Sequence, residues 1–493
     1  MNDEVVSIRE RNVRNDIPSR PTVRSPAGLE PHASSILSVE EIRHLYRRAA
    51  FAPTVAEVNA ALSLSRSQLV EQLLADQPAP SAPWWVNNLP YTGTLTTQQQ
   101  TDYRNWIREL REWWIRLMIT QPLSLTEKMT LFWHGHFATQ YSTVQVPQYH
   151  YKMNALLRRY ALGNFRDMVK AVSVDPCMLI YLDGVRNTAT APNENYAREV
   201  MELFTIGIGN YTQADIANAA KAFTGWQVRG LDAYFTASRH DNTIKTFMGR
   251  SGNFDGNAII DIIFQQEETA RFICRKLYSF FVYQIPDESV VDELATTFRA
   301  NNYELKPVLR LLFNSAHFFD PLMMSAEITS PIECAVGAIR QLGIPVPASS
   351  NVVPSYVRAT VETLGQSLFE PPNVAGWPGY RQWINTTSLL ARNQYTDSIV
   401  TGRNLSNQNI GFKVNPITFA QMFPLPNNAA ALVNDITAHL IPMAVTSSRR
   451  TMLLETLLQG IAPYDWNIAD PQAPARIEGL LKVMFRMAEY QLG

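Results

Sequence analysis

The sequence predicts a mainly α protein: a large multi-helix domain with one small β-hairpin. Apolar residues recur at three- and four-residue intervals along most of the 493-residue chain, which is the period of an amphipathic helix. Several of these stretches open with Ser or Thr followed three residues later by Glu, the pattern of a helix capping box. Clear alternation of apolar and polar residues, the period of a strand, occurs only over residues 226–238.

Residues 1–36 are expected to form a disordered N-terminal tail. They are charged, contain proline and show no apolar periodicity. A helical core domain is expected over residues 37–400, and its first helix should open with a capping box formed by Ser38 and Glu41. Thr54 repeats the pattern for the second helix.

The longest helix is expected over residues 97–120, with an aromatic stripe typical of core. Ser124 and Glu127 have the spacing to cap the next helix, which contains the motif FWHGHF. Residues 193–207, NENYAREVMELFTIG, are expected to form a short central helix that begins at Asn193.

The single hairpin follows this central helix, over residues 226–238. Further helices continue to about residue 393, interrupted by the rigid loop PPNVAGWPGY at residues 371–380. Residues 401–493 are expected to form a C-terminal helical extension packed on the core.

Composition excludes several classes of protein. The formal net charge of −1 gives no attraction to nucleic acid, so no nucleic-acid partner is expected. No run of eighteen apolar residues occurs, so no membrane span is expected. The N-terminus is polar and lacks a secretory signal peptide, so a cytoplasmic location is expected, with export to the periplasm as the alternative. Motifs of serine hydrolases, P-loop and Rossmann nucleotide sites and zincins are absent.

The candidate metal ligands are His134 and His136, which flank Gly135 in FWHGHF. Two residues apart on a continuous helix, they would point about 200° apart and could not share one ion. They could share one if the helix ended or broke at Gly135. Glu194, which opens the acid-bearing helix, is the third candidate ligand. The alternative is one core histidine and one surface histidine.

The candidate catalytic residues lie on the central helix and after the hairpin. Glu199 and Glu202 lie beside the apolar stripe of residues 193–207, where a carboxylate needs a cation, a metal or a proton. Arg198 is a further candidate, although its spacing also fits a plain helix salt bridge with Glu194. His240 and Asp241 can supply a base and its orienting group, or simply form a turn.

Five stretches occur in an order that resembles the bacterial family known as domain of unknown function 1800. The resemblance implies a functional role for the same histidines and acids. It also implies an exported, sulfatase-like family as a partner, and in some relatives a His where this chain has Phe204. The stretches are HLYRRAAFAPTVAEV (44–58), MTLFWHGHFAT (129–139), NENYAREVMELFTIGIGNYTQADIANAAKAFTGW (193–226), HDNTIKTFMG (240–249) and PPNVAGWPGYRQWINTTSLLARN (371–393).

Two functions are compatible with the sequence. The first is an enzyme with a buried polar pocket, either a metal-dependent or a Glu/His acid–base hydrolase or oxidoreductase. Mixed nitrogen and oxygen ligands would suit Zn²⁺, Fe²⁺ or Mn²⁺. The alternative is a non-catalytic scaffold or assembly protein that works with a partner protein, in which the motifs only hold the fold together.

Overall fold

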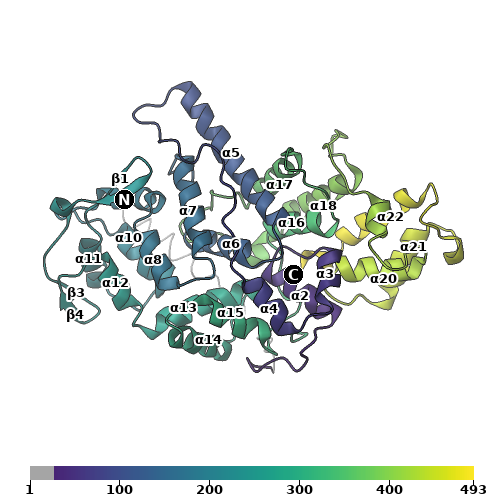
Figure 1. Cartoon of the computed structure of the whole chain (residues 1–493), viewed down its shortest axis with the longest axis horizontal. Helices are drawn as coiled ribbons and strands as arrows, with labels where there is room; N and C mark the ends of the chain where they lie inside the picture. The colour runs from purple at the N-terminus through teal and green to yellow at the C-terminus, as the bar shows by residue number, and fades with distance from the viewer. Residues whose placement is uncertain (1–26) are drawn as a thin grey trace.

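The computed structural model of the protein describes residues 27–493 and confirms the mainly α class. The body is elongated (Figure 1). Helices α20–α22 lie at one end, α10–α12 lie with the short strands at the other, and the C-terminus lies beside α2 in the middle. Within residues 27–493, no helix combines the length and the hydrophobicity needed to cross a bilayer.

The first half of the chain forms short helices around one long one. The helices are α2 (Val39–Ala49), α3 (Val55–Ala61), α4 (Arg66–Leu74), α5 (Thr97–Thr120), α6 (Thr126–His136), α7 (Pro147–Arg159), α8 (Phe165–Ser173), α9 (Pro176–Tyr181), α10 (Asn195–Glu199) and α11 (Gln213–Ala222), with a 3₁₀ turn, η1 (Gly184–Arg186).

The second half continues in the same manner. Its helices are α12 (Gly256–Ile263), α13 (Glu267–Phe281), α14 (Glu288–Ala300), α15 (Leu305–Asn314), α16 (Pro331–Gln341), α17 (Val352–Thr363), α18 (Thr386–Thr401), α19 (Pro416–Ala420), α20 (Ala429–Leu440), α21 (Ser447–Leu458) and α22 (Ala473–Phe485), with 3₁₀ turns η3 (Ala237–Arg239), η4 (Tyr380–Trp383), η5 (Pro463–Asp465) and η6 (Ala488–Gln491).

The expected hairpin forms between β1 (Trp226–Arg229) and β2 (Asp232–Phe235), paired antiparallel. A second, smaller hairpin that the sequence did not predict joins β3 (Lys245–Phe247) to β4 (Arg250–Gly252). Each of its strands has three residues, too few to show alternation.

Capping follows the sequence pattern at the first two helices and fails at α6. Ser38 and Thr54 each form a complete capping box. The predicted box of Ser124 and Glu127 does not form, because α6 starts at Thr126 without a side-chain cap. The Glu127 carboxylate instead accepts hydrogen bonds from Trp114 and Arg158. Glu127 therefore forms a tertiary ion pair with Arg158 and not the predicted helix cap.

The central helix departs from the expected single α-helix. Helix α10 ends at Glu199 and continues as a π-helix, η2 (Val200–Thr205), in which Ile206 N–H donates to the Met201 carbonyl five residues earlier. The wider π turn leaves the carbonyls of Leu203 and Phe204 available to other parts of the chain.

Two hydrophobic cores meet at α6. The first is built by α2–α4 and α6–α15, and the second by α5 and α16–α22. Phe132 and Trp133 belong to the first core, whereas Leu131 belongs to the second. The first core includes residues up to Met323, and most of the second core follows from Ile332 onward. Residues 401–493 contribute to the second core together with α5.

The expected N-terminal tail is described only in part. Of the expected tail, residues 1–26 lie outside the described part of the chain. Residues 27–36 pack on the first core: Leu29 is buried, Pro31 pairs with Ser315, and His32 N–H donates to Asn314 O at 2.9 Å.

Candidate functional site

The two histidines of FWHGHF hold different segments of the chain. On the continuous helix α6 their rings point to different sides. The Nε2 atom of His134 accepts the backbone N–H of Phe369 at 3.0 Å and so fixes the start of the loop that leads to PPNVAGWPGY. The ring packs against Trp114 and Trp377. Burial lowers the pKa of His134 to about 3, so the ring is neutral at physiological pH.

His136 joins the π-helix to α13. Its Nε2 lies 2.9 Å from the Phe204 carbonyl and its Nδ1 lies 3.2 Å from Lys276 Nζ. A carbonyl can only accept, so Nε2 carries the hydrogen and Nδ1 is an acceptor. Lys276 therefore donates to Nδ1, and it also donates to the Leu203 carbonyl at 3.1 Å. Burial lowers the pKa of His136 well below its usual value.

A glycine pair brings the loop at residues 371–380 onto α6. Gly376 has φ +81°, and a Cβ atom there would lie 2.1 Å from the carbonyl oxygen of Gly135. A Cβ on Gly135 would lie 3.8 Å from the Trp377 ring. Glycine at position 376 is thus required twice, once by the backbone angle and once by the close approach.

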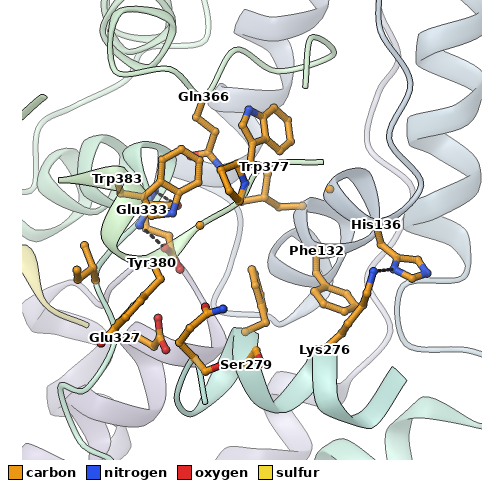
Figure 2. Close-up of a pocket in the computed structure, with 18 of the residues that line it drawn as sticks. Phe132, His136, Lys276, Ser279, Glu327, Glu333, Gln366, Trp377, Tyr380 and Trp383 are labelled. Atoms are coloured by element: carbon orange, nitrogen blue, oxygen red, sulfur yellow. Dashed lines mark hydrogen bonds between the residues drawn. The ribbon is translucent and has the colours of Figure 1, made fainter. Parts of the chain in front are cut away.

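Beneath this loop lies a pocket of about 540 Å³, within the range typical of small-molecule sites. It lies where α6, α13 and the start of α16 meet (Figure 2). Aromatic rings form much of its wall: Phe132, Phe272, Phe280, Trp377, Tyr380 and Trp383. Ionisable and polar side chains line the remainder: Arg48, His136, Arg275, Lys276, Ser279, Gln284, Glu327, Ser330, Glu333 and Gln366.

Glu327 is the most unusual polar group in the pocket. The residue is 6% exposed, and its Oε1 atom is buried without a hydrogen-bond partner among the described residues. Burial raises the pKa of Glu327 to about 7, against the opposing charge of Arg48. The side chain can therefore hold or release a proton near neutral pH.

Two further groups add to this polarity. Burial lowers the pKa of Lys276 to about 8, so a fraction of its amine is uncharged at neutral pH. The indole Nε1 of Trp377 is buried without a hydrogen-bond partner among the described residues. Figure 2 shows Glu327 and the Lys276–His136 pair on opposite sides of the pocket view.

A buried ion pair borders the pocket through Glu333. Lys128, fully buried on α6, pairs with Glu333 at the start of α16. Burial alone would raise the pKa of Glu333, but the charges of Lys128 and Arg48 outweigh it and lower the pKa to about 2. Arg48 donates to the carbonyls of Phe280 and Phe281 at the end of α13. These charges are already satisfied by the protein, whereas Glu327 has no ion pair among the described residues.

The predicted acids on the central helix lie away from this pocket. Glu194 pairs with Arg198 at 3.0 Å on a partly exposed surface, as a plain helix salt bridge. Glu202 accepts a hydrogen bond from Tyr211 at 3.1 Å. Glu199 is buried, and its charge contributes to the raised pKa of Tyr181. None of these four residues lines the pocket.

His240 and Asp241 support the two hairpins. The His240 Nδ1 atom lies 2.9 Å from the Thr224 carbonyl, and Asp241 Oδ1 accepts the backbone N–H of Thr243 at 2.8 Å. The buried Lys245 donates to the Asp241 carbonyl at 2.6 Å. Both residues therefore take part in the turns that hold the two hairpins.

The predicted metal ligands do not converge. The ring nitrogens of the two histidines already form hydrogen bonds: His134 with Phe369, and His136 with Phe204 and Lys276. Glu194 forms its surface salt bridge with Arg198. Across residues 27–493, no group of three or more His, Cys, Asp or Glu side chains is arranged to hold a metal ion. These residues do not fit a shared ion.

A Cys–His pair is present elsewhere but has no pocket. Cys177 Sγ lies 3.6 Å from His150 Nδ1, which resembles a nucleophile and its base. Both residues are fully buried, and burial raises the pKa of Cys177 well above its usual value. A protonated, enclosed thiol is a core group rather than a nucleophile.

Of the residues predicted from the sequence, only His136 lines the pocket. Lys276 and Glu327 were missed because each occurs in a segment without a motif. One signal was available: the loop PPNVAGWPGY was recognised as rigid, and it supplies Trp377 and Tyr380 to the pocket wall.

Comparison with known proteins gives a family and nothing more specific. A family model described as "Protein of unknown function (DUF1800)" matches residues 44–492. No curated protein matches the chain, and no solved structure matches it either.

Proposed function

Because the chain belongs to the DUF1800 family of proteins of unknown function, we propose a function from the pocket itself: the protein is an enzyme that transfers protons on a small organic substrate. The observation that supports this proposal is the presence of Glu327 and Lys276 on the wall of one aromatic pocket, each with a pKa near neutrality. General acid–base catalysts work best when their pKa lies near the working pH.

The two groups have complementary roles. The protonated Glu327 carboxyl donates a proton at one end of the substrate and, once ionised, recovers it. The uncharged Lys276 amine accepts a proton at the other end. His136 positions Lys276, because its fixed Nε2–H leaves Nδ1 as an acceptor.

The aromatic wall favours a flat, largely apolar substrate. Rings such as Phe132, Phe280 and Trp383 exclude water, which strengthens every electrostatic interaction inside the pocket. Water exclusion also keeps Glu327 protonated. The same wall therefore selects the substrate and sets the pKa of the acid.

The test uses Glu327→Gln beside Glu455→Gln, a matched change at an exposed glutamate outside the pocket. Compounds that raise the melting temperature of the native protein would be selected from panels of esters, amides, glycosides and carbonyl compounds. We expect turnover of at least one of them to fall about 100-fold or more in Glu327→Gln, the usual contribution of general acid–base catalysis. Glu455→Gln should match the native protein.

Infrared difference spectroscopy tests the carboxyl group without a substrate. A protonated-carboxyl band that titrates near pH 7 should be present in the native protein and absent from Glu327→Gln. Equal turnover by Glu327→Gln, or the same titration in both proteins, would disprove the proposal. Binding without any turnover would favour the alternative of a non-catalytic assembly protein.

A further inference from the structure

Lys276 differs from its neighbours in lacking a carboxylate partner. Arg275, next to it on α13, pairs with both Glu268 and Glu288. Within residues 27–493 no carboxylate lies within ion-pairing distance of Lys276 Nζ. The groups around this nitrogen are the neutral His136 ring from α6, the Leu203 carbonyl from η2 and the ring of Phe272, 4.8 Å away on its own helix.

The two hydrogen bonds of Lys276 fix the orientation of its amine. Both acceptors lie on the protein, so both N–H groups of the uncharged amine are already engaged in hydrogen bonds. An uncharged amine held in this way keeps its lone pair for a bound molecule. Unpaired lysines in partly apolar surroundings are the ones that act as nucleophiles toward carbonyl groups.

We propose that Lys276 uses its lone pair as a nucleophile rather than as a base, and forms an imine with a carbonyl substrate that has a flat apolar body. The inference rests on the proposed acid–base function and names its substrate class. The apolar body would lie between rings such as Phe132 and Trp377, and a polar group at its far end would face Glu327.

The covalent step conserves atoms and electrons. The Nζ lone pair of Lys276 attacks the carbonyl carbon, which forms a C–N bond and breaks the C=O π bond. The oxygen takes one proton from the amine and a second from solvent, and leaves as water when the C–O bond breaks. The resulting iminium keeps one N–H, which can still donate to His136 Nδ1. No oxidant or reductant is consumed.

Reductive trapping tests the proposal on the full chain. The protein would be incubated at pH 7 with benzaldehyde and sodium cyanoborohydride, which reduces an iminium to a stable secondary amine, and benzylated lysines would be located by peptide mass spectrometry. With a pKa of about 8, Lys276 has an uncharged fraction on the order of 100-fold larger than an exposed lysine. Modification of Lys276 should exceed that of the half-exposed Lys413 by a similar factor.

Two variants make the result specific. Lys276→Arg can still donate to His136 and Leu203 but cannot form an imine, so it should stay folded and lose the pocket adduct. Lys413→Arg is the matched control and should be benzylated at Lys276 as the native protein is. A role limited to capping the π-helix carbonyls would give no selective adduct.

Modification of Lys276 no faster than of Lys413 would overturn the imine. The proposed function is judged separately, because turnover and the carboxyl titration depend on Glu327. If no adduct forms but turnover still depends on Glu327, the nucleophilic role of Lys276 is disproved and the proposed acid–base function stands. If neither the Lys276 adduct nor Glu327-dependent turnover is found, both proposals fail.

Discussion

At the scale of single residues, Glu327 and Glu333 show how the surroundings set the charge of a buried carboxyl group. Glu333 faces Lys128 and has its pKa lowered to about 2. Glu327, six residues earlier, has no ion pair within the described chain, and burial raises its pKa to about 7. The first carboxylate stabilises the fold in its charged form, whereas the second stabilises it in its neutral form.

Glu327→Gln should remove a pH dependence of stability that has an unusual sign. Between pH 4.5 and 7 the folded protein keeps the Glu327 proton while the unfolded chain releases it, so folding becomes less favourable as pH rises through this window. The loss reaches about 3 kcal/mol above pH 7, at 1.36 kcal/mol per pKa unit. The unfolding free energy of the variant minus that of the native protein should therefore be larger at pH 8 than at pH 5.

The measurement is the free energy of unfolding in urea at both pH values. Glu333→Gln is the contrasting variant: it leaves the fully buried Lys128 unpaired and should destabilise by about 3–5 kcal/mol at pH 7, as broken buried pairs do. Parallel pH profiles for the native protein and Glu327→Gln would show that Glu327 is ionised in the fold.

At the scale of elements, the contact between α6 and the loop at residues 371–380 depends on Gly376. Gly376→Ala adds a methyl group 2.1 Å from the Gly135 carbonyl and also strains a backbone with φ +81°. Gly365→Ala is a matched control, because Gly365 has φ +87° and open space around its Cβ position. The control should cost about 1–2 kcal/mol from backbone strain alone.

Gly376→Ala should cost several kcal/mol more than this control, because backbone must move to relieve the clash. Thermal unfolding of the two variants measures the difference, and ligand-induced stabilisation shows whether the pocket survives. Equal losses in the two variants would mean that the loop does not need its close approach to α6.

The sequence predicted those features of the helices and strands that depend on residues adjacent in the chain. The caps at Ser38 and Thr54 and the hairpin at β1–β2 each follow from a few adjacent side chains. The π-helix η2 was not predictable, because the groups that use its open carbonyls, His136 and Lys276, come from segments about 70 residues away on either side.

The candidate site was less predictable than the fold for the same reason. His136 was identified because it belongs to a motif. Lys276 has the sequence surroundings of any lysine on an amphipathic helix, and Glu327 those of any loop acid. Their pKa values depend on burial by segments that are distant in the sequence, which no local pattern encodes.

At the scale of the whole molecule, the interior contains an unusual number of neutral histidines. Burial lowers the pKa of five of them far below that of free histidine: His44, His134 and His439 to about 3, His150 to about 4, and His136 by a large amount. An unfolded chain would protonate all five near pH 6.5. Acid therefore favours the unfolded state.

The protein should lose stability steeply as pH falls below 6.5. By pH 5 each histidine contributes about 2 kcal/mol in favour of unfolding, so that the five together approach the whole stability of a typical domain. Circular dichroism against pH should show cooperative unfolding between pH 6 and 4.5. The pH dependence of the unfolding free energy should correspond to an uptake of about five protons.

His44→Gln is the variant that checks the source of these protons. Its amide can still donate to the Phe318 carbonyl, as the imidazole does at 3.0 Å, but it does not titrate. The variant should take up one proton fewer on unfolding. If the native protein takes up fewer than about two protons on unfolding, the five histidines are not buried in their neutral form.

The meeting of the two cores at α6 has a consequence for the order of folding. The pocket draws on Arg48, on α6, on α13 and on the loop at residues 371–380, segments separated by up to about 330 residues. Contacts across such distances carry a large loop-closure entropy and form slowly. We expect helices to collapse into their separate cores first. The aromatic wall would then stay exposed in a late folding intermediate until the final loop docks, and chaperones would recognise the chain at that stage.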